Sequence, residues 1–337
     1  MRSLEIKSLF NVPKLSLYLE KVDGAISKSL VSDNPFINEP LSRLIKSHGK
    51  RLRPALLIAV VFSQKKQIDQ SVISACAAIE LIHIGSLVHD DIIDNADARR
   101  NVPTINSQEG EDRALVIGDY LLAKACVEGA KISGLIGEKI ASTIAKLCDG
   151  ESRELASQYN VNRSQTDYLL AIEGKTASLF AAACEIGGMC AGLDSSSISS
   201  LEKYGREFGM SFQLIDDLID LLSTAELLGK PVGNDLKEGV YTMPILLALS
   251  GNSRKRLAAL LTNKKQIVLD EVVNSLVNDQ SIQRTLLYAK KYNKLAVKAL
   301  SKSPGDYANL IELPDAYLNY CLENLVAKKY RSTVSGS

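Results

Sequence analysis

Two acidic clusters with the same pattern stand out in the sequence. Asp90-Asp91-Ile92-Ile93-Asp94 and Asp216-Asp217-Leu218-Ile219-Asp220 both read Asp-Asp-x-x-Asp, and each follows an apolar run. Residues four apart share one face of a helix, with Cβ atoms about 6 Å apart, so the first and last aspartates of each motif project together. Like charges at that spacing cost roughly 0.2–0.5 kcal/mol per pair on an exposed helix. A pattern that occurs twice therefore indicates a bound cation rather than two solvated helix ends.

The donor chemistry of these clusters favours a hard ion. They offer carboxylate oxygens without neighbouring pairs of Cys or His. Mg²⁺ binds one or two carboxylates and completes its octahedron with water and phosphate oxygens. We therefore expect Mg²⁺ together with a phosphate-bearing substrate.

Basic residues accompany both motifs. They are the segment Gly49-Lys50-Arg51-Leu52-Arg53-Pro54, the pair Arg99 and Arg100 after the first motif, Lys175 in an apolar run, and Lys230 and Lys237 after the second motif. Singly, such cations are usually surface side chains. Beside metal-binding aspartates they predict a site for two polyanions, because Arg forks and Lys point charges both suit diphosphate oxygens. No P-loop pattern, a glycine-rich loop ending in Gly-Lys-Ser or Gly-Lys-Thr, occurs in the chain.

Helical periodicity dominates the segments that carry these residues. Apolar residues recur at three- and four-residue steps before each motif, as in Leu81, Ile84 and Val88. With 9 Pro and 21 Gly in 337 residues, breakers are too few for a turn-rich β protein. We expect about ten to thirteen helices, over residues 14–32, 35–46, 51–64, 68–95, 108–131, 135–158, 164–191, 195–223, 241–250, 253–263, 266–279, 280–302 and 314–330.

The domain organisation follows from the same survey. No interdomain linker or repeat interrupts the chain, so residues 1–331 are predicted to form a single all-α domain, a bundle of mostly antiparallel helices. Residues 332–337 are small and polar and are expected to fray. The longest loop is expected over residues 223–241, which contain Gly229, Pro231, Gly233 and Gly239.

Composition excludes several classes of function. The net charge of +1 and the absence of Trp argue against a nucleic-acid partner. No run approaches the roughly 18 apolar residues of a membrane helix, so no transmembrane segment is expected. The charged N-terminus lacks a secretory h-region, and the six cysteines form no CxxC pairs. A cytoplasmic protein is the simplest reading.

Several ordered motifs resemble those of trans-isoprenyl diphosphate synthases. The segment His89–Arg100 resembles the first aspartate-rich motif of that family, Phe212–Asp220 resembles the second, and Gly229–Gly239 resembles the loop that follows. The similarity extends from about Gly49 to Pro244, and the polyprenyl branch, with the heptaprenyl and octaprenyl diphosphate synthases, is the most similar.

The resemblance implies a fold and a reaction. The fold is the isoprenoid synthase fold, helices around a deep central cavity. In the reaction an allylic diphosphate ionises, isopentenyl diphosphate attacks the cation head-to-tail in the trans sense, a proton is lost and diphosphate is released. The chemistry fits the residues, because Mg²⁺ and cations stabilise the leaving diphosphate. An apolar cavity excludes the water that would trap the cation.

The resemblance also assigns roles to residues. Asp90, Asp94, Asp216 and Asp220 hold Mg²⁺, with Asp91 and Asp217 in support; about three ions bind with substrate, and Mn²⁺ can substitute. The residues expected at isopentenyl diphosphate are Gly49, Lys50, Arg53, His83 and Arg100. Those expected at the allylic diphosphate are Arg99, Lys175, Thr176, Gln213, Lys230 and Lys237. The catalytic set is Asp90, Asp94, Arg99, Lys175, Asp216 and Lys230.

Chain length should depend on the helix before Asp90. One turn upstream, where a bulky aromatic stops growth early in this family, stand the small residues Gly85 and Ser86, and Ile82 lies beyond them. An open tunnel predicts a product of roughly C30–C40, the size of a quinone side chain, on a helix that rises 1.5 Å per residue. Simple helix packing, in which small residues admit a neighbouring helix, is the alternative explanation. The chain also departs from many relatives at Gln108-Glu109-Gly110, where they carry Trp-Gly.

Alternatives remain at this level. A shorter C20 geranylgeranyl diphosphate synthase uses the same motifs. A terpene cyclase shares the first motif but usually not the second. A regulatory subunit would have lost the aspartates, whereas the catalytic subunit of a heteromeric synthase would keep them. The family expectation is a homodimer, with a heterodimer as the alternative and peripheral membrane contact during product release.

Overall fold

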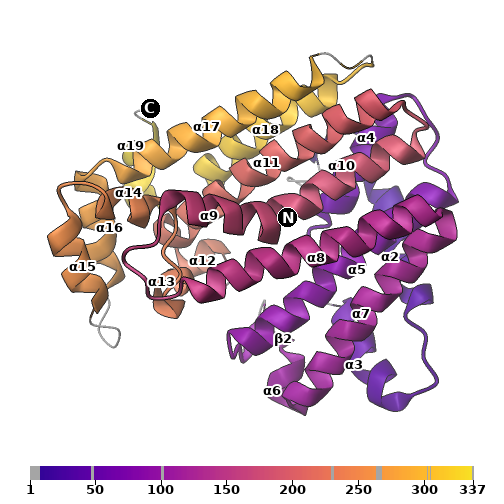
Figure 1. The fold of residues 1–337 in the computed structure, drawn as a ribbon, viewed down its shortest axis with the longest axis horizontal. Helices are drawn as coiled ribbons and strands as arrows, with labels where there is room; N and C mark the ends of the chain where they lie inside the picture. Colours follow the sequence, from indigo (N-terminus) through magenta and orange to yellow (C-terminus); the bar gives the residue numbers. More distant parts are fainter. Residues whose placement is uncertain are drawn as a thin grey trace. The chain divides into compact units, whose positions relative to one another are not determined.

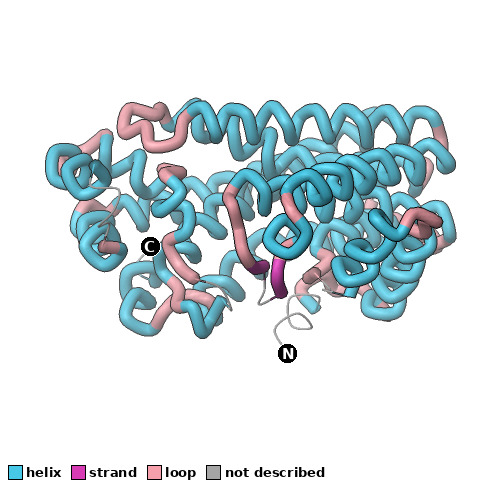
Figure 2. Tube along the Cα trace, turned by 90° about the horizontal axis from the view of Figure 1, so that it is seen from below, coloured by secondary structure: helices cyan, strands magenta, loops and turns pink. Residues whose placement is uncertain are grey.

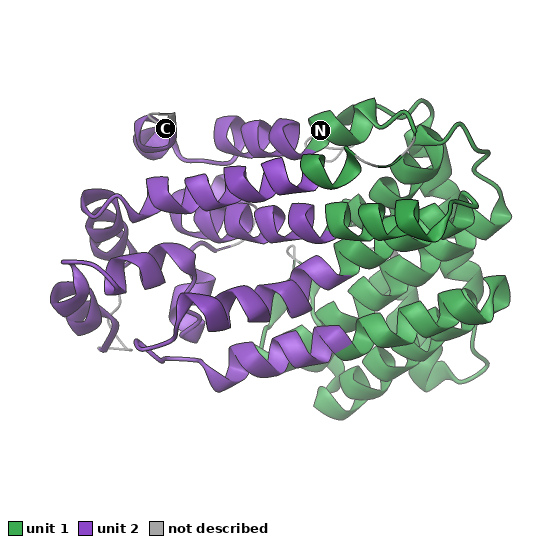
Figure 3. Ribbon diagram, turned by 45° about the horizontal axis from the view of Figure 1, so that its top comes forward, with its two compact units in different colours: residues 1–145, 179–205, 297–313 green, residues 146–178, 206–296, 314–337 purple. Residues whose placement is uncertain are grey.

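The computed structural model describes residues 8–46, 49–99, 102–228, 231–262, 268–301, 303 and 305–335. Within these residues the protein is built from helices, with one short pair of strands (Figure 2). The chain divides into two compact units, coloured separately in Figure 3. Unit 1 comprises residues 1–145, 179–205 and 297–313, and unit 2 comprises residues 146–178, 206–296 and 314–337. The prediction of an all-α protein is confirmed; that of a single domain over residues 1–331 stays a prediction.

Unit 1 contains the first acidic motif. Its helices are α2 (Leu15–Ser29), α3 (Pro35–Lys46), α4 (Leu52–Ser63), α5 (Gln70–Ile93), α6 (Ile105–Glu109) and α7 (Glu111–Ile132). Helix α5 is packed against α2, α4 and α7 (Figure 1). Strands β1 (Ala98–Arg99) and β2 (Val102–Pro103) pair antiparallel after α5. No hairpin was expected there.

Unit 2 contains the second motif and most of the short elements. These are α9 (Gln165–Ile172), the π-helical η1 (Glu173–Ala177), α12 (Ala225–Leu228), α13 (Asn234–Glu238), α14 (Met243–Leu249), α15 (Arg254–Thr262), α16 (Leu269–Asn278), the 3-10 turn η2 (Lys328–Tyr330) and α19 (Arg331–Ser335). Five helices contribute residues to both units: α8 (Gly134–Ala156), α10 (Ser178–Cys190), α11 (Ser195–Leu222), α17 (Ser281–Leu300) and α18 (Ala308–Asn324).

Helix ends follow the local sequence. The Asp69 side chain caps α5 by accepting a hydrogen bond from the Val72 amide at 3.0 Å, and the Ser164 hydroxyl caps α9 in the same way. Such caps are worth about 1 kcal/mol each, because they satisfy an amide that the helix leaves unpaired. Gly110, with φ of 91°, separates α6 from α7, so the helix expected over residues 108–131 is two helices.

Other differences from the expected helices are local. The helix predicted over residues 164–191 contains the π segment η1, and the expected loop over 223–241 contains α12 and α13. The last predicted helix begins earlier, at Ala308, and tolerates Pro314 in its interior. Residues Arg331–Ser335 form α19 with Val334 buried, and residues 336–337 lie outside the described part; the fraying expected over residues 332–337 stays a prediction.

Helix α5 is more apolar than the sequence analysis anticipated. By length and composition alone it could cross a membrane, with a mean hydropathy of 1.8 over its best 18-residue window. In the structure 72% of that window is buried within the protein. A core helix of a globular fold passes the same composition test, so α5 by itself is weak support for a membrane span.

Helices α10 and α11 approach closely at Gly205. A Cβ on Gly205 would overlap the Phe180 carbonyl oxygen and lie 2.8 Å from the Cys184 sulfur. We predict that Gly205→Ala lowers the free energy of unfolding by about 1–3 kcal/mol, because backbone must move to admit the methyl group. Urea denaturation measures this.

The matched control is Gly24→Ala in α2, where an added Cβ meets nothing within 4 Å. It should raise stability by about 0.4–1 kcal/mol, since alanine restricts the unfolded chain. Equal stabilities of the Gly205→Ala variant and the wild type would contradict the close approach of the two helices.

Candidate active site

The first motif occupies the last turn of α5 in unit 1. The Asp94 amide donates to the Asp90 carbonyl at 2.9 Å, so the i,i+4 relation expected from the sequence is present. Asp90 is half-buried and Asp94, the C-cap residue, is exposed. Both carboxylates stand at the C-terminal, negative end of the helix dipole, where anions are disfavoured by about 0.3–1 kcal/mol each.

The middle aspartate of this motif is anchored to the protein. Asp91 is 7% exposed, and the Arg99 guanidinium of β1 donates to its Oδ1 at 2.8 Å. Burial raises the pKa of Asp91 above its ordinary value, and Arg99 opposes part of that rise. Arg99, expected at the allylic diphosphate, thus already holds a carboxylate. Arg100 lies outside the described residues.

A cavity of about 240 Å³ lies beside this motif within unit 1. One face of α5 lines it, at spacings of three and four residues from Glu80 to Asp91. Three of the residues predicted for substrate binding reach its wall: Gly49, His83 and Arg99. Lys50 beside Gly49 is exposed, and the Arg53 guanidinium stacks over the Phe180 ring at 4.7 Å. The structure therefore groups part of the predicted isopentenyl diphosphate site around one cavity.

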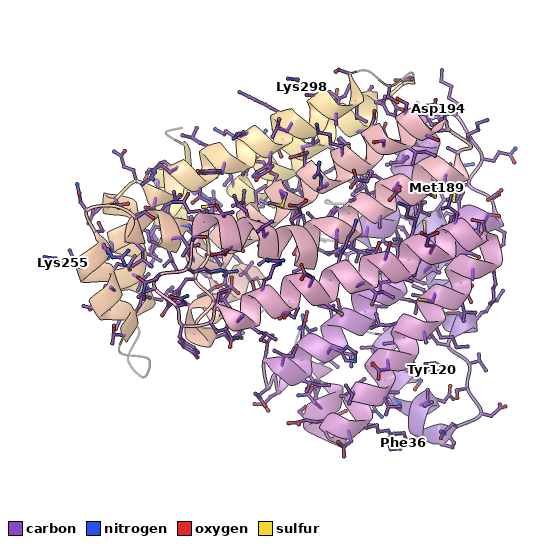
Figure 4. The ribbon with its side chains drawn as sticks, in the orientation of Figure 1. Phe36, Tyr120, Met189, Asp194, Lys255 and Lys298 are labelled. Atoms are coloured by element: carbon purple, nitrogen blue, oxygen red, sulfur yellow. The ribbon has the colours of Figure 1, made fainter. Side chains whose placement is uncertain are left out.

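The departure at Gln108-Glu109-Gly110 has a structural role. Gln108 lines the cavity. The Glu109 carboxylate forms ion pairs with Arg43 of α3 and with Arg113 of α7, the latter at 2.6 Å. Arg113 also stacks over the ring of Phe36, which is labelled at the lower edge of Figure 4. These contacts attach α3, which walls the cavity, to α6 and α7.

The residues predicted to line the chain-length tunnel lie in different surroundings. Ile82 is fully buried. Gly85 packs against α7, where an added Cβ would lie 3.0 Å from Leu122 Cδ2 and 3.3 Å from the Gly118 carbonyl oxygen. Ser86 is half-buried, and its hydroxyl donates to the His83 carbonyl at 3.0 Å. Close helix packing accounts for Gly85, so Ser86 is the better position from which to probe a tunnel.

The second motif lies on α11 in unit 2. Asp216 is exposed, whereas Asp217 and Asp220 are 2% and 5% exposed. Asp217 accepts hydrogen bonds from the Tyr168 hydroxyl and from Gln213 Nε2, the latter at 2.8 Å. As in the first motif, the middle aspartate accepts hydrogen bonds from side chains of its own unit.

A chain of hydrogen bonds continues from that aspartate. The Thr176 hydroxyl donates to Gln213 Oε1 at 2.6 Å, which orients the amide so that its nitrogen faces Asp217. Thr176 and Gln213 were both predicted from the sequence as diphosphate ligands. The structure joins them to the second motif through side chains of η1, α11 and α9.

Lys175 lies on η1 where that segment crosses α8. The backbones of Gly150 and Gly174 approach so closely that a Cβ on Gly174 would lie 2.7 Å from Gly150 Cα. The Lys175 ammonium contacts the carboxylates of Glu151 at 2.7 Å and Glu154 at 2.6 Å. Single π-helical turns inside α-helices often mark functional sites. A diphosphate at Lys175 would share it with these two carboxylates.

Further acidic residues gather around this motif. Desolvation and the charges of Asp220, Asp217, Asp216 and Glu154 raise the pKa of Asp235 well above its ordinary value. Sequence reasoning missed Asp235 and Glu154, although Asp235 stands in the loop that resembles the family. Tyr168 was also missed, and its position seven residues before Lys175 gave no local signal. Lys237 is exposed, and Lys230 lies outside the described residues.

The donor set is compatible with a divalent ion bound together with substrate. Within the described residues, no group of three or more His, Cys, Asp or Glu side chains is arranged to hold a metal by itself. The carboxylates nevertheless raise one another's pKa, and a cation would relieve that repulsion. Mg²⁺ commonly takes one or two carboxylates and obtains its remaining ligands from phosphates and water, which this arrangement permits.

The anchored aspartate predicts a pH-dependent stability. Burial raises the pKa of Asp217 from 3.8 to about 7, despite its donors Tyr168 and Gln213. The folded protein therefore binds this proton more strongly than the unfolded chain, and its contribution to stability is lost as pH rises from about 4 to about 7. Relative to Asp217→Asn, the metal-free wild type should lose on the order of 1–3 kcal/mol between pH 5 and pH 8.

Denaturation in the presence of a chelator measures this difference. Asp33→Asn, an exposed position, serves as the control and should leave the pH profile of the wild type unchanged. Parallel profiles for the wild type and Asp217→Asn would show that Asp217 does not retain its proton.

Comparison with known proteins shows the family to which the chain belongs. The family model for polyprenyl synthetase matches residues 34–278. A heptaprenyl diphosphate synthase component 2 from Geobacillus stearothermophilus is 33% identical over 308 residues, 90% of this chain and 95% of the relative. A geranylgeranyl diphosphate synthase from Saccharolobus solfataricus is 30% identical, over 86% of this chain and 92% of the relative.

The fold is similar to that of solved structures as well. A polyprenyl synthase from Caulobacter crescentus, complexed with calcium and isoprenyl diphosphate, superposes with a TM-score of 0.84 at 30% identity and covers 93% of this chain and 97% of its own. The sequence match, the all-α isoprenoid synthase fold and the doubled acidic motif all indicate the same family. The chain belongs to the polyprenyl synthetase family of trans-isoprenyl diphosphate synthases.

Proposed function

We propose that the protein is a trans-polyprenyl diphosphate synthase, which condenses isopentenyl diphosphate with an allylic diphosphate and releases diphosphate. One observation carries the proposal: the Asp-Asp-x-x-Asp pattern is built twice, each time with its middle aspartate anchored. Asp91 is held by Arg99, and Asp217 by Tyr168 and Gln213. Anchoring fixes the rotamer of one carboxylate. It thereby also fixes the helix end on which the other two carboxylates lie.

Members of the family use a divalent metal. We propose Mg²⁺, with Asp90, Asp94, Asp216 and Asp220 as the ligands and Asp91 and Asp217 in support. Bound there, the metal supplies charge stabilisation to the departing diphosphate. The number of ions, about three with substrate present, belongs to the same proposal.

The residues of the chain then act by binding, orienting and excluding water. Gly49, Lys50, Arg53 and His83 bind isopentenyl diphosphate at the unit 1 cavity, whose apolar wall on α5 includes Ile84 and Val88. Arg99 and Lys175 bind the allylic diphosphate by sharing their present carboxylate partners. The C–O bond of the allylic substrate breaks with its electron pair leaving on diphosphate. The new C–C bond then forms, and the proton lost from the condensed product passes to diphosphate.

The relatives support a long product and leave a short one open. We propose roughly C30–C40, because Ser86 and Gly85 place no aromatic side chain one turn before Asp90. Geranylgeranyl diphosphate, the C20 product, is the second candidate, since a synthase of that name matches most of this chain. A quinone side chain is the proposed fate of the longer product.

Assembly is also a proposal. A homodimer is the expectation, yet the Geobacillus relative is named as one component of a synthase. That name favours testing whether this chain needs a second, different subunit. We further propose a cytoplasmic enzyme that touches the membrane peripherally when it releases product.

Substitution of one aspartate in each acidic motif tests the proposed metal ligands. Asp90→Ala and Asp216→Ala should each lower kcat by about a hundredfold or more, because each removes a carboxylate ligand of the metal that stabilises the leaving diphosphate. The assay follows incorporation of labelled isopentenyl diphosphate by the purified chain with Mg²⁺ and a farnesyl or geranylgeranyl primer. Asp33→Ala, on the exposed chain between α2 and α3, should keep wild-type turnover.

Two results would change the proposed metal ligands or the proposed subunit composition. Near-normal rates in either motif variant would remove the metal assignment. Absence of turnover by the purified chain, with turnover appearing only after a second subunit is added, would identify a heteromeric synthase.

Another prediction concerns product length. Ser86→Phe should shorten the longest product by at least one isoprene unit, because its ring extends about 5–6 Å from α5. Chromatography of the dephosphorylated products measures the length. Ser71→Phe, at an exposed position near the start of α5, is the control and should leave the length unchanged. A wild-type product that stops at C15 would contradict the long-chain proposal.

A further inference from the structure

A group of three charges, with Arg51 and Glu80 buried and Asp23 half-buried, supports the loop that begins α4. The Arg51 side chain is 4% exposed and donates from Nε to Asp23 Oδ1 at 2.7 Å and from Nη1 to Glu80 Oε1 at 2.6 Å. Asp23 lies on α2 and Glu80 on α5, and Glu80 is itself 2% exposed. The three residues thus connect three helices of unit 1 at one point.

The backbone of Arg51 is held in an uncommon conformation. Its φ of 54° and ψ of 38° lie in the left-handed region, which a residue with a Cβ rarely occupies. Its carbonyl oxygen nevertheless accepts the first hydrogen bond of α4, from the Ala55 amide at 3.0 Å. Such a conformation persists only where the surrounding structure determines it, and the two carboxylates provide that determination.

The loop held in this way belongs to the cavity. Gly49, Arg51, Glu80 and His83 all line it. Because Arg51 separates Lys50 from Leu52-Arg53, its position sets where both flanking cations stand. The Arg51 charge itself is occupied by two carboxylates within 2.7 Å, so Arg51 is poorly suited to bind a diphosphate directly.

We propose that Arg51, clamped by Asp23 and Glu80, is a positioning residue that presents Lys50 and Arg53 to the diphosphate of isopentenyl diphosphate. The inference rests on the proposed function and adds to it a buried support that touches no substrate. If the proposal holds, loss of the clamp lowers the affinity for isopentenyl diphosphate. It changes the affinity for the allylic substrate and the rate of the chemical step less.

Arg51→Gly tests the clamp directly. Glycine adopts the left-handed turn freely, so the turn remains permitted while both ion pairs are lost. We expect KM for isopentenyl diphosphate to rise about tenfold or more, which is the effect of losing one well-placed charge contact. KM for the allylic diphosphate and kcat should change by less than about twofold.

A second variant guards against unfolding. The triple change Arg51→Met, Asp23→Asn and Glu80→Gln removes the whole charge group, so that no carboxylate is left buried without its partner. It should show the same selective rise in KM for isopentenyl diphosphate. Arg51→Lys, which keeps one charge but lacks the fork of two donors, should fall between the wild type and Arg51→Gly.

The matched control breaks an interhelical ion pair elsewhere in unit 1. Lys139 of α8 contacts Glu185 of α10 at 2.7 Å, away from the residues that line the cavity. Lys139→Met should lower thermal stability without altering either KM. If Arg51 has a purely structural role, Arg51→Gly will also lower thermal stability and leave both KM values unchanged. That result would overturn the proposal. So would equal rises in both KM values.

Two measurements on the unreacted protein separate this inference from the proposed function. Calorimetry with isopentenyl diphosphate alone gives its affinity without turnover, and this affinity should weaken in Arg51→Gly. Amide hydrogen exchange at Ala55 should accelerate in the same variant, because its acceptor, the backbone carbonyl of residue 51, is then no longer held in place by the two ion pairs. A wild-type chain that transfers no prenyl group, even after a second subunit is added, would refute the proposed function. Unchanged exchange and unchanged affinity in Arg51→Gly would refute the clamp.

Discussion

Carboxylates at the C-terminal ends of apolar helices impose the main constraint on this protein. The helix dipole there is negative, burial disfavours the ionised form, and the neighbouring acids repel one another. Each motif meets the constraint in the same way: the middle carboxylate takes a fixed partner within its own unit, Arg99 for Asp91 and Tyr168 with Gln213 for Asp217. The remaining carboxylates repel one another, and a bound divalent cation would relieve this repulsion.

Close backbone contact determines where Lys175 stands in unit 2. The glycines at positions 150 and 174 let η1 lie directly on α8, which brings Lys175 to Glu151 and Glu154. The π turn alters the helical phase at this point, so that Thr176 reaches Gln213. Small side chains and an irregular turn therefore determine where charged residues stand.

The sequence predicted the long helices well and the tertiary contacts poorly. Periodic apolar residues located α5 and α11 to within about two residues. The helix break at Gly110 and the π turn were not predicted, because neither changes the apolar period strongly. The Tyr168–Asp217 bond and the Arg51–Glu80 pair join residues 49 and 29 positions apart, and no local pattern encodes such pairs. In the sequence, Glu109 is notable only as a departure from relatives, and no local pattern indicates its ion pairs with Arg43 and Arg113.

The apolar length of α5 has a consequence for synthesis of the chain. A segment that satisfies the composition test for a membrane span is hazardous while it is uncovered. Helices α2 and α4 precede it, and α7 ends about forty residues after it. At roughly 5–20 residues per second, the last of these three covering helices emerges within several seconds of α5. Early local packing of this kind keeps this long apolar helix exposed only briefly on the ribosome.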